Sequence, residues 1–282
     1  MNKSLILDHD IGTNPDDFFA LLMLLNSNQV NLSMTISGNG YPNERARLAN
    51  KIISQSNKPG VESFVGKKTG RTNFFGNQFT KEYEPQLSSN YVGAIKNLIN
   101  TKGEVIYLCI QGLSNLAQFA KKYPKDVGKL DIIHMGLTTK NADNFVGGGT
   151  NMEADPMAAK YIYELGLPNF RVVGSHTTIN DSIRIHPDTQ AYKKLSESGE
   201  ANHGMLLTHL HEYNTRRGIW PALHDPLTAS VALTEKFVDF EEINIEFRDD
   251  GSYRLGGNTK VLVSKEEINN SGGFMDLVAE LV

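Results

Sequence analysis

The sequence predicts an α/β protein built on an open, mainly parallel sheet that is flanked by helices. Short runs rich in Ile, Val and Leu alternate with longer segments of helical periodicity, which is the pattern of parallel strands joined by crossover helices. Each apolar run ends in a polar or glycine-containing turn. No composition break marks a linker in the 282 residues, so we expect one domain, residues 1–282.

The individual elements follow from periodicity and turn chemistry. Apolar runs of strand length are predicted strands at 4–7, 32–36, 104–110, 131–135 and 170–173. Segments with apolar residues at helical spacing are predicted helices at 16–26, 43–54, 115–122 and 155–165. Near the end of the chain, alternation around a D-D-G turn predicts a small C-terminal β-hairpin that reverses at 249–251.

Composition and charge exclude several classes of partner. The formal net charge is −4 and no basic run is present, so we expect no nucleic acid and no membrane surface as partner. The single cysteine, Cys109, excludes an internal disulfide and a thiolate zinc cluster. No apolar run approaches the roughly 18 residues that span a bilayer, and the first residues do not form a signal peptide. We expect a cytoplasmic protein with a small-molecule partner.

The most unusual segment is D-H-D-I-G-T-N-P-D-D, which carries Asp8, Asp10, Asp16 and Asp17 with no Lys or Arg among them. Carboxylates this close repel one another unless a positive charge compensates them. Oxygen ligands without cysteine favour Ca²⁺ or Mg²⁺ over zinc. The segment therefore predicts a site for a hard divalent cation.

An ordinary explanation covers part of this pattern. Asn14, Asp155 and Asp225 each precede a proline, and a capping side chain followed by proline is typical of a helix start. Acids in a first helical turn also complement the helix dipole, and His224 would then be a surface histidine. That explanation leaves the two acids at the end of the first predicted strand without a role.

The turns after the predicted strands are expected to converge. In a parallel sheet they all lie at the carboxyl edge, where α/β proteins bind their ligands. Asp10, Asn39 and Ser114 each follow a different strand. We therefore expect these three residues to share one crevice.

Five segments in order resemble one known family: D-H-D-I-G-T-N-P-D-D, S-G-N-G, G-L-S-N, N-M-E-A-D-P-M-A-A and L-H-D-P-L. Together they are similar to the nucleoside hydrolases of the inosine-uridine-preferring type, over residues 5 to about 233. The resemblance implies Ca²⁺-dependent hydrolysis of the N-glycosidic bond of nucleosides or close analogues, which releases base and ribose for salvage. It also implies a homodimer or homotetramer.

The resemblance further implies roles for individual residues. The Ca²⁺ ligands would be Asp10, Asp17, Asp225 and the backbone carbonyl of Ser114. The catalytic pair would be Asp10, as general base for the attacking water, and His224, as the donor of a proton to the leaving base. The ribose hydroxyls would contact Asp16, Asn39 and Asn151.

The sequence also departs from the family pattern, mainly on the substrate side. The loop before Asp16 is two residues longer than usual, and Gly149 stands where an acidic residue is common. Glu153 lies close by and is a further candidate for substrate binding, although its offset differs. The basic residues Lys67, Lys68 and Arg71 are unusual in their loop. They are either solvated loop charges or, by hypothesis, they favour substrates with an anionic 5′ substituent.

Two other functions remain open. A haloacid-dehalogenase-type phosphatase also begins with Asp-x-Asp after a strand, but Gly12 replaces its usual Thr or Val and the late glycine-aspartate motif is missing. A catalytically weak or inactive calcium-dependent nucleoside or sugar binder would explain Gly149. The presence of both Asp10 and His224 favours the enzyme.

Overall fold

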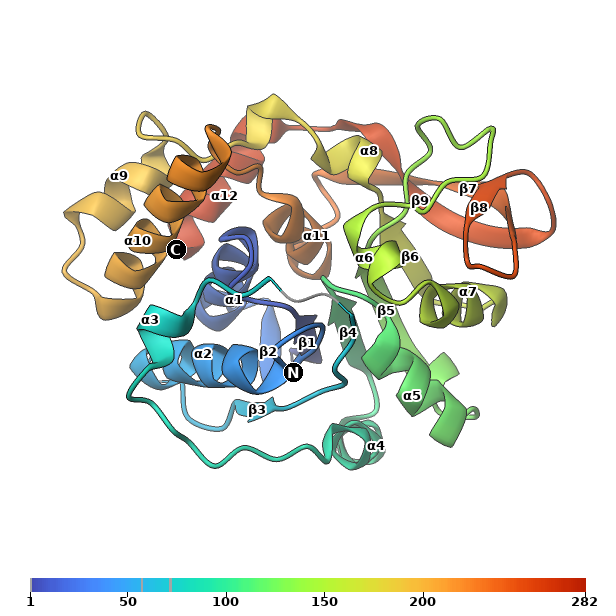
Figure 1. Ribbon diagram of the computed structural model, residues 1–282, viewed down its shortest axis with the longest axis horizontal. Helices are drawn as coiled ribbons and strands as arrows, with labels where there is room; N and C mark the ends of the chain where they lie inside the picture. The colour runs from blue at the N-terminus through green and yellow to red at the C-terminus, as the bar shows by residue number, and fades with distance from the viewer. Residues whose placement is uncertain (1, 57, 71–72) are drawn as a thin grey trace.

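One nine-stranded sheet runs through the computed structural model, which describes residues 2–56, 58–70 and 73–282 (Figure 1). The strands are β1 (Lys3–His9), β2 (Val30–Ser37), β3 (Glu62–Phe64), β4 (Val105–Cys109), β5 (Leu130–Met135), β6 (Phe170–Val173), β7 (Val238–Phe247), β8 (Tyr253–Leu255) and β9 (Thr259–Ile268). Their order across the sheet is β3-β2-β1-β4-β5-β6-β9-β7-β8.

Helices fill most of the connections. The α-helices are α1 (Asp16–Asn26), α2 (Pro42–Gln55), α3 (Asn77–Thr80), α4 (Tyr91–Lys102), α5 (Ser114–Lys122), α6 (Thr150–Ala154), α7 (Pro156–Glu164), α8 (Ser175–Thr178), α9 (Gln190–Glu197), α10 (Ala201–Arg217), α11 (His224–Leu233) and α12 (Ser271–Leu281). Two short 3₁₀ turns are η1 (Val127–Lys129) and η2 (Asp181–Ile183).

The sheet is mainly parallel, as predicted. Every pairing from β3 to β9 is parallel, whereas β7 runs antiparallel to both β9 and β8. The chain builds outward from β1 in one direction through β2 and β3, and then in the other through β4, β5 and β6. The order thus reverses between β1 and β4, and ligands of α/β sheets bind at such a reversal.

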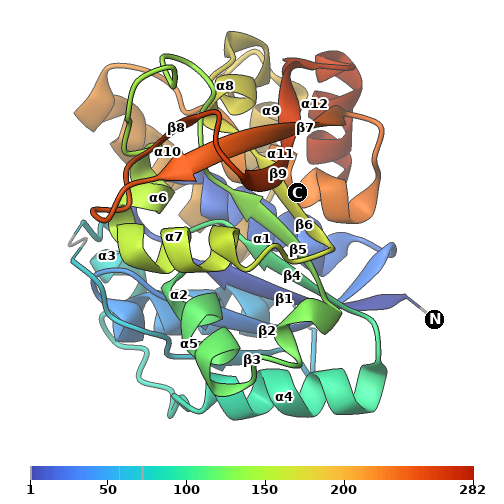
Figure 2. The ribbon, with the colours of Figure 1, turned by 90° about the vertical axis from the view of Figure 1, so that its right-hand side faces the viewer.

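The central strands are buried on both faces, which is why they read as continuous apolar runs. In β1, Leu5 and Leu7 pack into the core formed with α1, α2, α11 and α12. Ile6, between them, faces the opposite core, formed with α4, α5 and α7. Figure 2 looks onto one face of the sheet, with α4, α5 and α7 in front of it and the arrowhead of β5 directed toward the side where α3 and α6 lie. The N-terminus lies on the opposite side.

Most predicted elements are confirmed with ends displaced by one or two residues. The predicted hairpin is also present, because β7 pairs with β8 from Ile245–Leu255 to Phe247–Tyr253. Two predicted helix caps are wrong, although α1 begins at the predicted residue. Pro15, not Asn14, is the residue before α1, and no side chain caps this helix. α11 begins at His224, so Asp225 lies inside its first turn and does not precede the helix. Because Asp225 does not cap the helix, its carboxylate can face the site.

Membrane-spanning helices were searched for in the parts of the chain that the structure describes. None of the helices found there is both long and apolar enough to cross a bilayer.

Candidate active site

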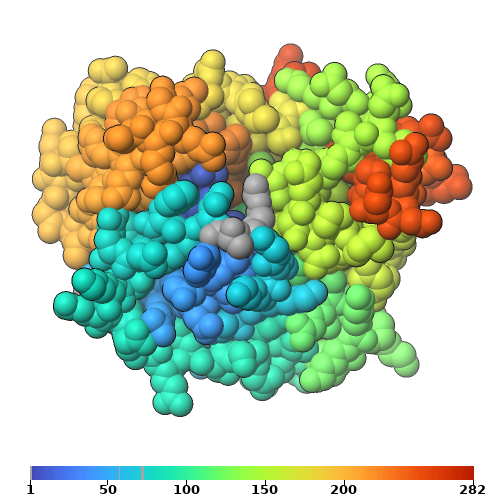
Figure 3. Space-filling model, viewed as in Figure 1, coloured from blue at the N-terminus to red at the C-terminus, as the bar shows by residue number. Residues whose placement is uncertain are grey.

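The polar ends of several strands and helices meet at the carboxyl edge of the sheet. β1 leads into α1 through residues 10–15, and the first turn of α11 packs against α1. Figure 3 views this edge: the N-terminal residues, in dark blue, are visible only at the bottom of a depression. Its walls are α10 in orange, the segment after β3 in cyan to teal, and the region of α6 in yellow-green. The predicted crevice therefore lies between segments that are distant in sequence.

Three buried carboxylates form the floor of the site. Asp16 and Asp17 come from the first turn of α1 and Asp225 from the first turn of α11, and one oxygen of each lies within 4.8 Å of the others. Asp10 is buried beside them, and its backbone N–H donates to Asp17 Oδ1 at 3.0 Å. The structure thus brings together all four acids that the resemblance assigns to metal or sugar.

The electrostatics of this cluster favour a bound cation. Burial raises the pKa of Asp16 to about 7. Burial, followed by the charge of neighbouring acids, also raises the pKa values of Asp17 and Asp225. One buried oxygen of Asp16 has no hydrogen-bond partner among the described residues. Carboxylates that are costly to ionise together and that offer unused oxygens are suited to a hard divalent ion.

Ser114, the predicted carbonyl ligand, begins α5, and its hydroxyl donates to Asp155 Oδ2 at 2.7 Å. That contact fixes the start of α5 against α7. The next residue, Asn115, reaches under the site to Asp8 at 2.8 Å. The role of Ser114 as a metal ligand stays a prediction.

Asp8 lies below the cluster and joins β1 to β4. Its carboxylate accepts hydrogen bonds from Tyr107 Oη at 2.6 Å, from Asn115 Nδ2 and from Gln111 Nε2. Burial raises the pKa of Asp8 to about 7, although these hydrogen bonds act in the opposite direction. Asp8 therefore supports the strand ends from which Asp10 projects.

Two asparagines lie where the sugar is expected. Asn39 adopts a left-handed conformation with φ of 58°, and its Nδ2 donates to Asp10 Oδ2 at 2.9 Å. Asn151 donates from Nδ2 to the carbonyls of Ile110 and Met135, at 3.1 and 2.9 Å. Because its amide nitrogen is held by the protein, Asn151 has Oδ1 left to accept a hydrogen bond from a hydroxyl.

His224 immediately precedes Asp225 and is positioned by a threonine. Its Nδ1 lies 2.8 Å from Thr178 Oγ1, at the end of α8. Burial, followed by the charge of Arg184, lowers the pKa of His224 to about 4. With Nδ1 engaged, Nε2 is the nitrogen that remains for a ligand.

Sequence reasoning missed Arg45, which the structure places beside the acids. Its side chain is only 1% exposed, and its guanidinium donates to the backbone carbonyls of Asp10 and Ile11. The signal was present: Arg45 lies on the same face of α2 as Ala49 and Ile52, both buried. A charge on an apolar helix face points to a specific buried partner.

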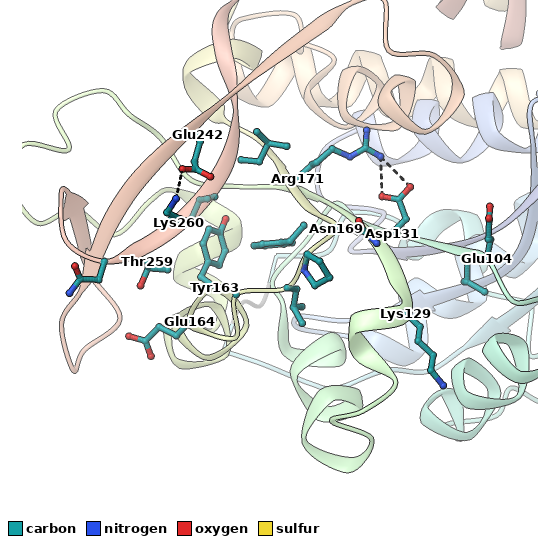
Figure 4. A pocket seen from close by; sticks show the side chains of 18 of the residues that line it. Glu104, Lys129, Asp131, Tyr163, Glu164, Asn169, Arg171, Glu242, Thr259 and Lys260 are labelled. Carbon is teal, nitrogen blue, oxygen red and sulfur yellow. Dashed lines mark hydrogen bonds and ion pairs between the residues drawn. The ribbon is translucent and has the colours of Figure 1, made fainter.

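A cavity of about 870 Å³ lies elsewhere, at the amino edge of the sheet (Figure 4). Each charged residue that lines it has an oppositely charged partner within the described chain. Examples are Arg171 with Asp131 at 3.0 Å and Lys260 with Glu242 at 2.8 Å. None of the acids of the carboxyl-edge cluster lines this cavity.

Comparison with known families decides the interpretation of the carboxyl edge. The model of the inosine-uridine preferring nucleoside hydrolase family matches residues 5–271. The chain belongs to this family. It is accordingly a hydrolase that acts on N-glycosyl bonds, in a family whose members depend on a metal. No curated protein matches the chain in a sequence search.

Solved nucleoside hydrolases share the fold at low sequence identity. A plant nucleoside hydrolase is 18% identical with a TM-score of 0.81, and the alignment covers 99% of this chain and 98% of that one. A purine-preferring ribonucleoside hydrolase from Gardnerella vaginalis is 20% identical at TM-score 0.78, with 99% of both chains covered. The inosine-uridine preferring enzyme from Bacillus anthracis is 18% identical at 0.76, over 99% and 100%.

The departures from the family pattern lie around the sugar side of this nucleoside hydrolase. Gly149 has open space where a side chain would project, and Glu153 is exposed on α6, with its carboxylate beside Gly147. Lys67 is engaged by Asp155 at 3.4 Å. Lys68 is exposed, and Arg71 lies outside the described residues, so the predicted preference for an anionic 5′ substituent stays a prediction.

Proposed function

We propose that the protein is a Ca²⁺-dependent nucleoside hydrolase that releases base and ribose from nucleosides or close analogues. The observation that carries the proposal is the convergence of Asp16, Asp17 and Asp225 beside Asp10, with His224 adjacent to the same cluster. The cluster offers oxygen ligands for a cation, and His224 directly precedes one of its members, Asp225, in the sequence. An acyl- or phosphate-transfer site would not need this combination.

The residues that would hold the ion are Asp10, Asp17, Asp225 and the carbonyl of Ser114. Their donor set is entirely oxygen, which suits Ca²⁺. When bound, Ca²⁺ supplies positive charge that polarises water and the sugar diol. Asp16, whose buried oxygen is unpaired among the described residues, would accept hydrogen bonds from the ribose hydroxyls together with Asn39 and Asn151 Oδ1.

The chain's own residues then account for the proton transfers. Asp10 would orient a water against the anomeric carbon and accept one of its protons as the new C–O bond forms. The C1′–N bond breaks, its electron pair remains on the base, and His224 Nε2 donates a hydrogen bond or proton to that nitrogen. Positive charge that develops on the ribose ring would be stabilised by the surrounding carboxylates.

A calcium-dependent binder without turnover is the alternative, and one observation favours it. Both amide atoms of Asn39 are engaged within the protein, Nδ2 by Asp10 and Oδ1 by the hydroxyl of Thr69 at 3.0 Å. A sugar hydroxyl would have to share or replace these contacts. The enzyme proposal is preferred because Asp10 lies beside the acid cluster and His224 directly precedes Asp225, and both observations support the proposed roles.

The direct test is an assay of free ribose from inosine and uridine, with and without chelator. We expect Asp17→Ala and Asp225→Ala each to abolish Ca²⁺ binding in calorimetry and ribose release, because the remaining acids lose a ligand to the shared cation. Ca²⁺ should also raise the melting temperature of the unmodified protein. Asp239→Ala, an exposed acid on β7, is the matched control.

The outcomes separate the two functions. Ca²⁺ binding with no ribose release from any nucleoside would support the binder, and absence of divalent-ion binding at millimolar metal would contradict both. A cytoplasmic location and assembly into a homodimer or homotetramer remain part of the proposal. Light scattering on the purified protein measures the assembly.

A further inference from the structure

We propose that Arg45 is a positioning residue of the metal site: its buried guanidinium holds the lengthened loop after β1 in place and ties it to the segment 73–76. The inference rests on the proposed function in one respect, namely that the acid cluster binds a divalent ion. It extends that function to Arg45, which is not one of the proposed Ca²⁺ ligands. It also identifies segment 73–76 as an element whose position is linked to the site.

Among the described residues, the hydrogen bonds of Arg45 reach three separate segments. Nη1 donates to the carbonyls of Asp10 and Ile11, the latter at 2.9 Å. Nε donates to the carbonyl of Gly40, after β2, at 2.6 Å, and Nη2 to the carbonyl of Asn73 at 2.5 Å. A planar guanidinium presents its donors in a fixed fork. Its acceptors are therefore held in one arrangement relative to one another.

Two of those segments also touch each other directly. Thr13 Oγ1 donates to the carbonyl of Asn73 at 2.7 Å, and Phe75 N donates to the carbonyl of Gly12 at 2.7 Å. The ring of Phe74 occupies the space beside Gly12, where no side chain would fit. Gly12 has φ of 96°, which other residues rarely adopt. The lengthened loop and segment 73–76 are thus packed as one unit, with Arg45 beneath their junction.

This junction joins the two main departures from the family pattern. The longer loop before Asp16 and the altered loop that follows β3 meet at the Asn73 carbonyl, which accepts from both Arg45 and Thr13. The backbone of Asp10 is held at two points, because its carbonyl accepts a hydrogen bond from Arg45 and its N–H donates one to Asp17. A shift of Asn73 would consequently move two of the proposed ligands relative to each other.

The charge of Arg45 and its hydrogen-bond geometry predict opposite effects of its removal on Ca²⁺ binding, which makes the inference testable. A buried cation lowers the pKa of Asp17, against the stronger effect of burial, and it would also repel a second cation. If Arg45 acted only as a counter-charge, its removal would tighten Ca²⁺ binding. If it positions the ligands, removal of the fork weakens binding even when the charge is kept.

Arg45→Lys keeps the charge but not the fork, and Arg45→Met removes both at similar length. We expect both variants to bind Ca²⁺ at least about tenfold more weakly in calorimetry and to lose turnover. Tighter binding by the methionine variant with wild-type binding by the lysine variant would overturn the inference. A lowered melting temperature with unchanged Ca²⁺ affinity in both would show a purely structural role and overturn it too.

A milder pair of variants covers the case in which Arg45 substitutions do not fold. Thr13→Val removes the second hydrogen bond to the Asn73 carbonyl, and Thr13→Ser keeps it. We expect a several-fold weaker Ca²⁺ affinity for the valine variant alone. Equal Ca²⁺ affinities of both Thr13 variants and the wild type would overturn the inference and leave the proposed function intact. A wild type that binds no divalent ion would overturn the proposed function.

Discussion

At the scale of single residues, one hydroxyl decides how His224 faces the site. Thr178 is fully buried, and His224 Nδ1 is the partner of its Oγ1 in the described part of the chain. A buried hydroxyl needs an acceptor for its hydrogen, so the contact favours donation from Thr178 to Nδ1. The single hydrogen of a neutral imidazole then sits on Nε2, where it can reach a departing base.

Removal of that hydroxyl should therefore impair leaving-group assistance. We expect His224→Ala to lower turnover of purine or pyrimidine nucleosides by about a hundredfold or more, and Thr178→Val by a smaller factor in the same direction. A riboside with a nitrophenolate leaving group should be much less affected by either change. Thr178→Ser is the control, and equal losses on both substrate types would contradict the assignment.

At this scale the sequence predicts some residues of the candidate site and misses others. The metal site was predictable because the two acids at the end of the first strand, Asp8 and Asp10, have no ordinary explanation there. Thr178 as the partner of His224 was not predictable, because it lies 46 residues away in the chain and a threonine in a polar turn carries no distinguishing pattern. Arg45 was visible only as a charge on an otherwise apolar helix face.

At the scale of elements, the C-terminal hairpin fastens a loop that leads into the site. Tyr253 on β8 is buried, and its hydroxyl donates to the carbonyl of Thr138 at 2.8 Å while accepting from Thr138 N at 2.7 Å. Its backbone also pairs in both directions with Val146. The loop between β5 and α6, which ends shortly before Asn151, is thereby attached to the hairpin.

Tyr253→Phe should loosen that loop without altering the metal site. The change removes both hydrogen bonds to Thr138. A typical hydrogen bond contributes a net free energy of about 0.5–1.5 kcal/mol. If that amount is lost from substrate binding, KM increases about two- to tenfold. Ca²⁺ affinity is expected to stay at the wild-type value. An unchanged KM would show that the position of Asn151 does not depend on the hairpin.

The hairpin itself was predictable from alternation and the D-D-G turn, but its docking was not. Local patterns specify which residues pair within a hairpin, whereas the pairing of Val146 with Tyr253 depends on a tertiary approach between distant segments. The same limit applies to helix caps. The residue before proline caps α7, where Asp155 accepts a hydrogen bond from Ala158 N at 3.1 Å, but Asn14 and Asp225 do not cap α1 and α11.

At the scale of the whole molecule, buried histidines make stability depend on pH. Burial lowers the pKa of both His134 and His209 to about 4, from 6.5. Between these values each of the two histidines binds a proton in the unfolded chain but not in the native protein, whereas the raised pKa values of Asp8 and Asp16 act in the opposite direction. The contribution of each histidine to stability is therefore complete above pH 6.5 and is lost as the pH falls toward 4.

The effect can be measured by urea unfolding at pH 7.5 and 5.5. For a single histidine with these pKa values, the free energy of unfolding should fall by about 1.3 kcal/mol between the two conditions. His209→Leu removes one such group, which packs against Phe79, and its pH-dependent loss should be smaller by that amount. An identical loss in the variant would contradict the assignment. A single transition seen by two probes would also agree with the one-domain prediction.

The distribution of the acids along the chain has a consequence for synthesis. Asp10, Asp16 and Asp17 leave the ribosome some 200 residues before Asp225, a delay of about 10 to 40 s at ordinary elongation rates. During that interval the proposed coordination sphere would lack Asp225, whereas Arg45 is a nearby cation that the nascent chain already contains. Capture of an ion at the proposed site would therefore follow the synthesis of α11 and its packing against α1.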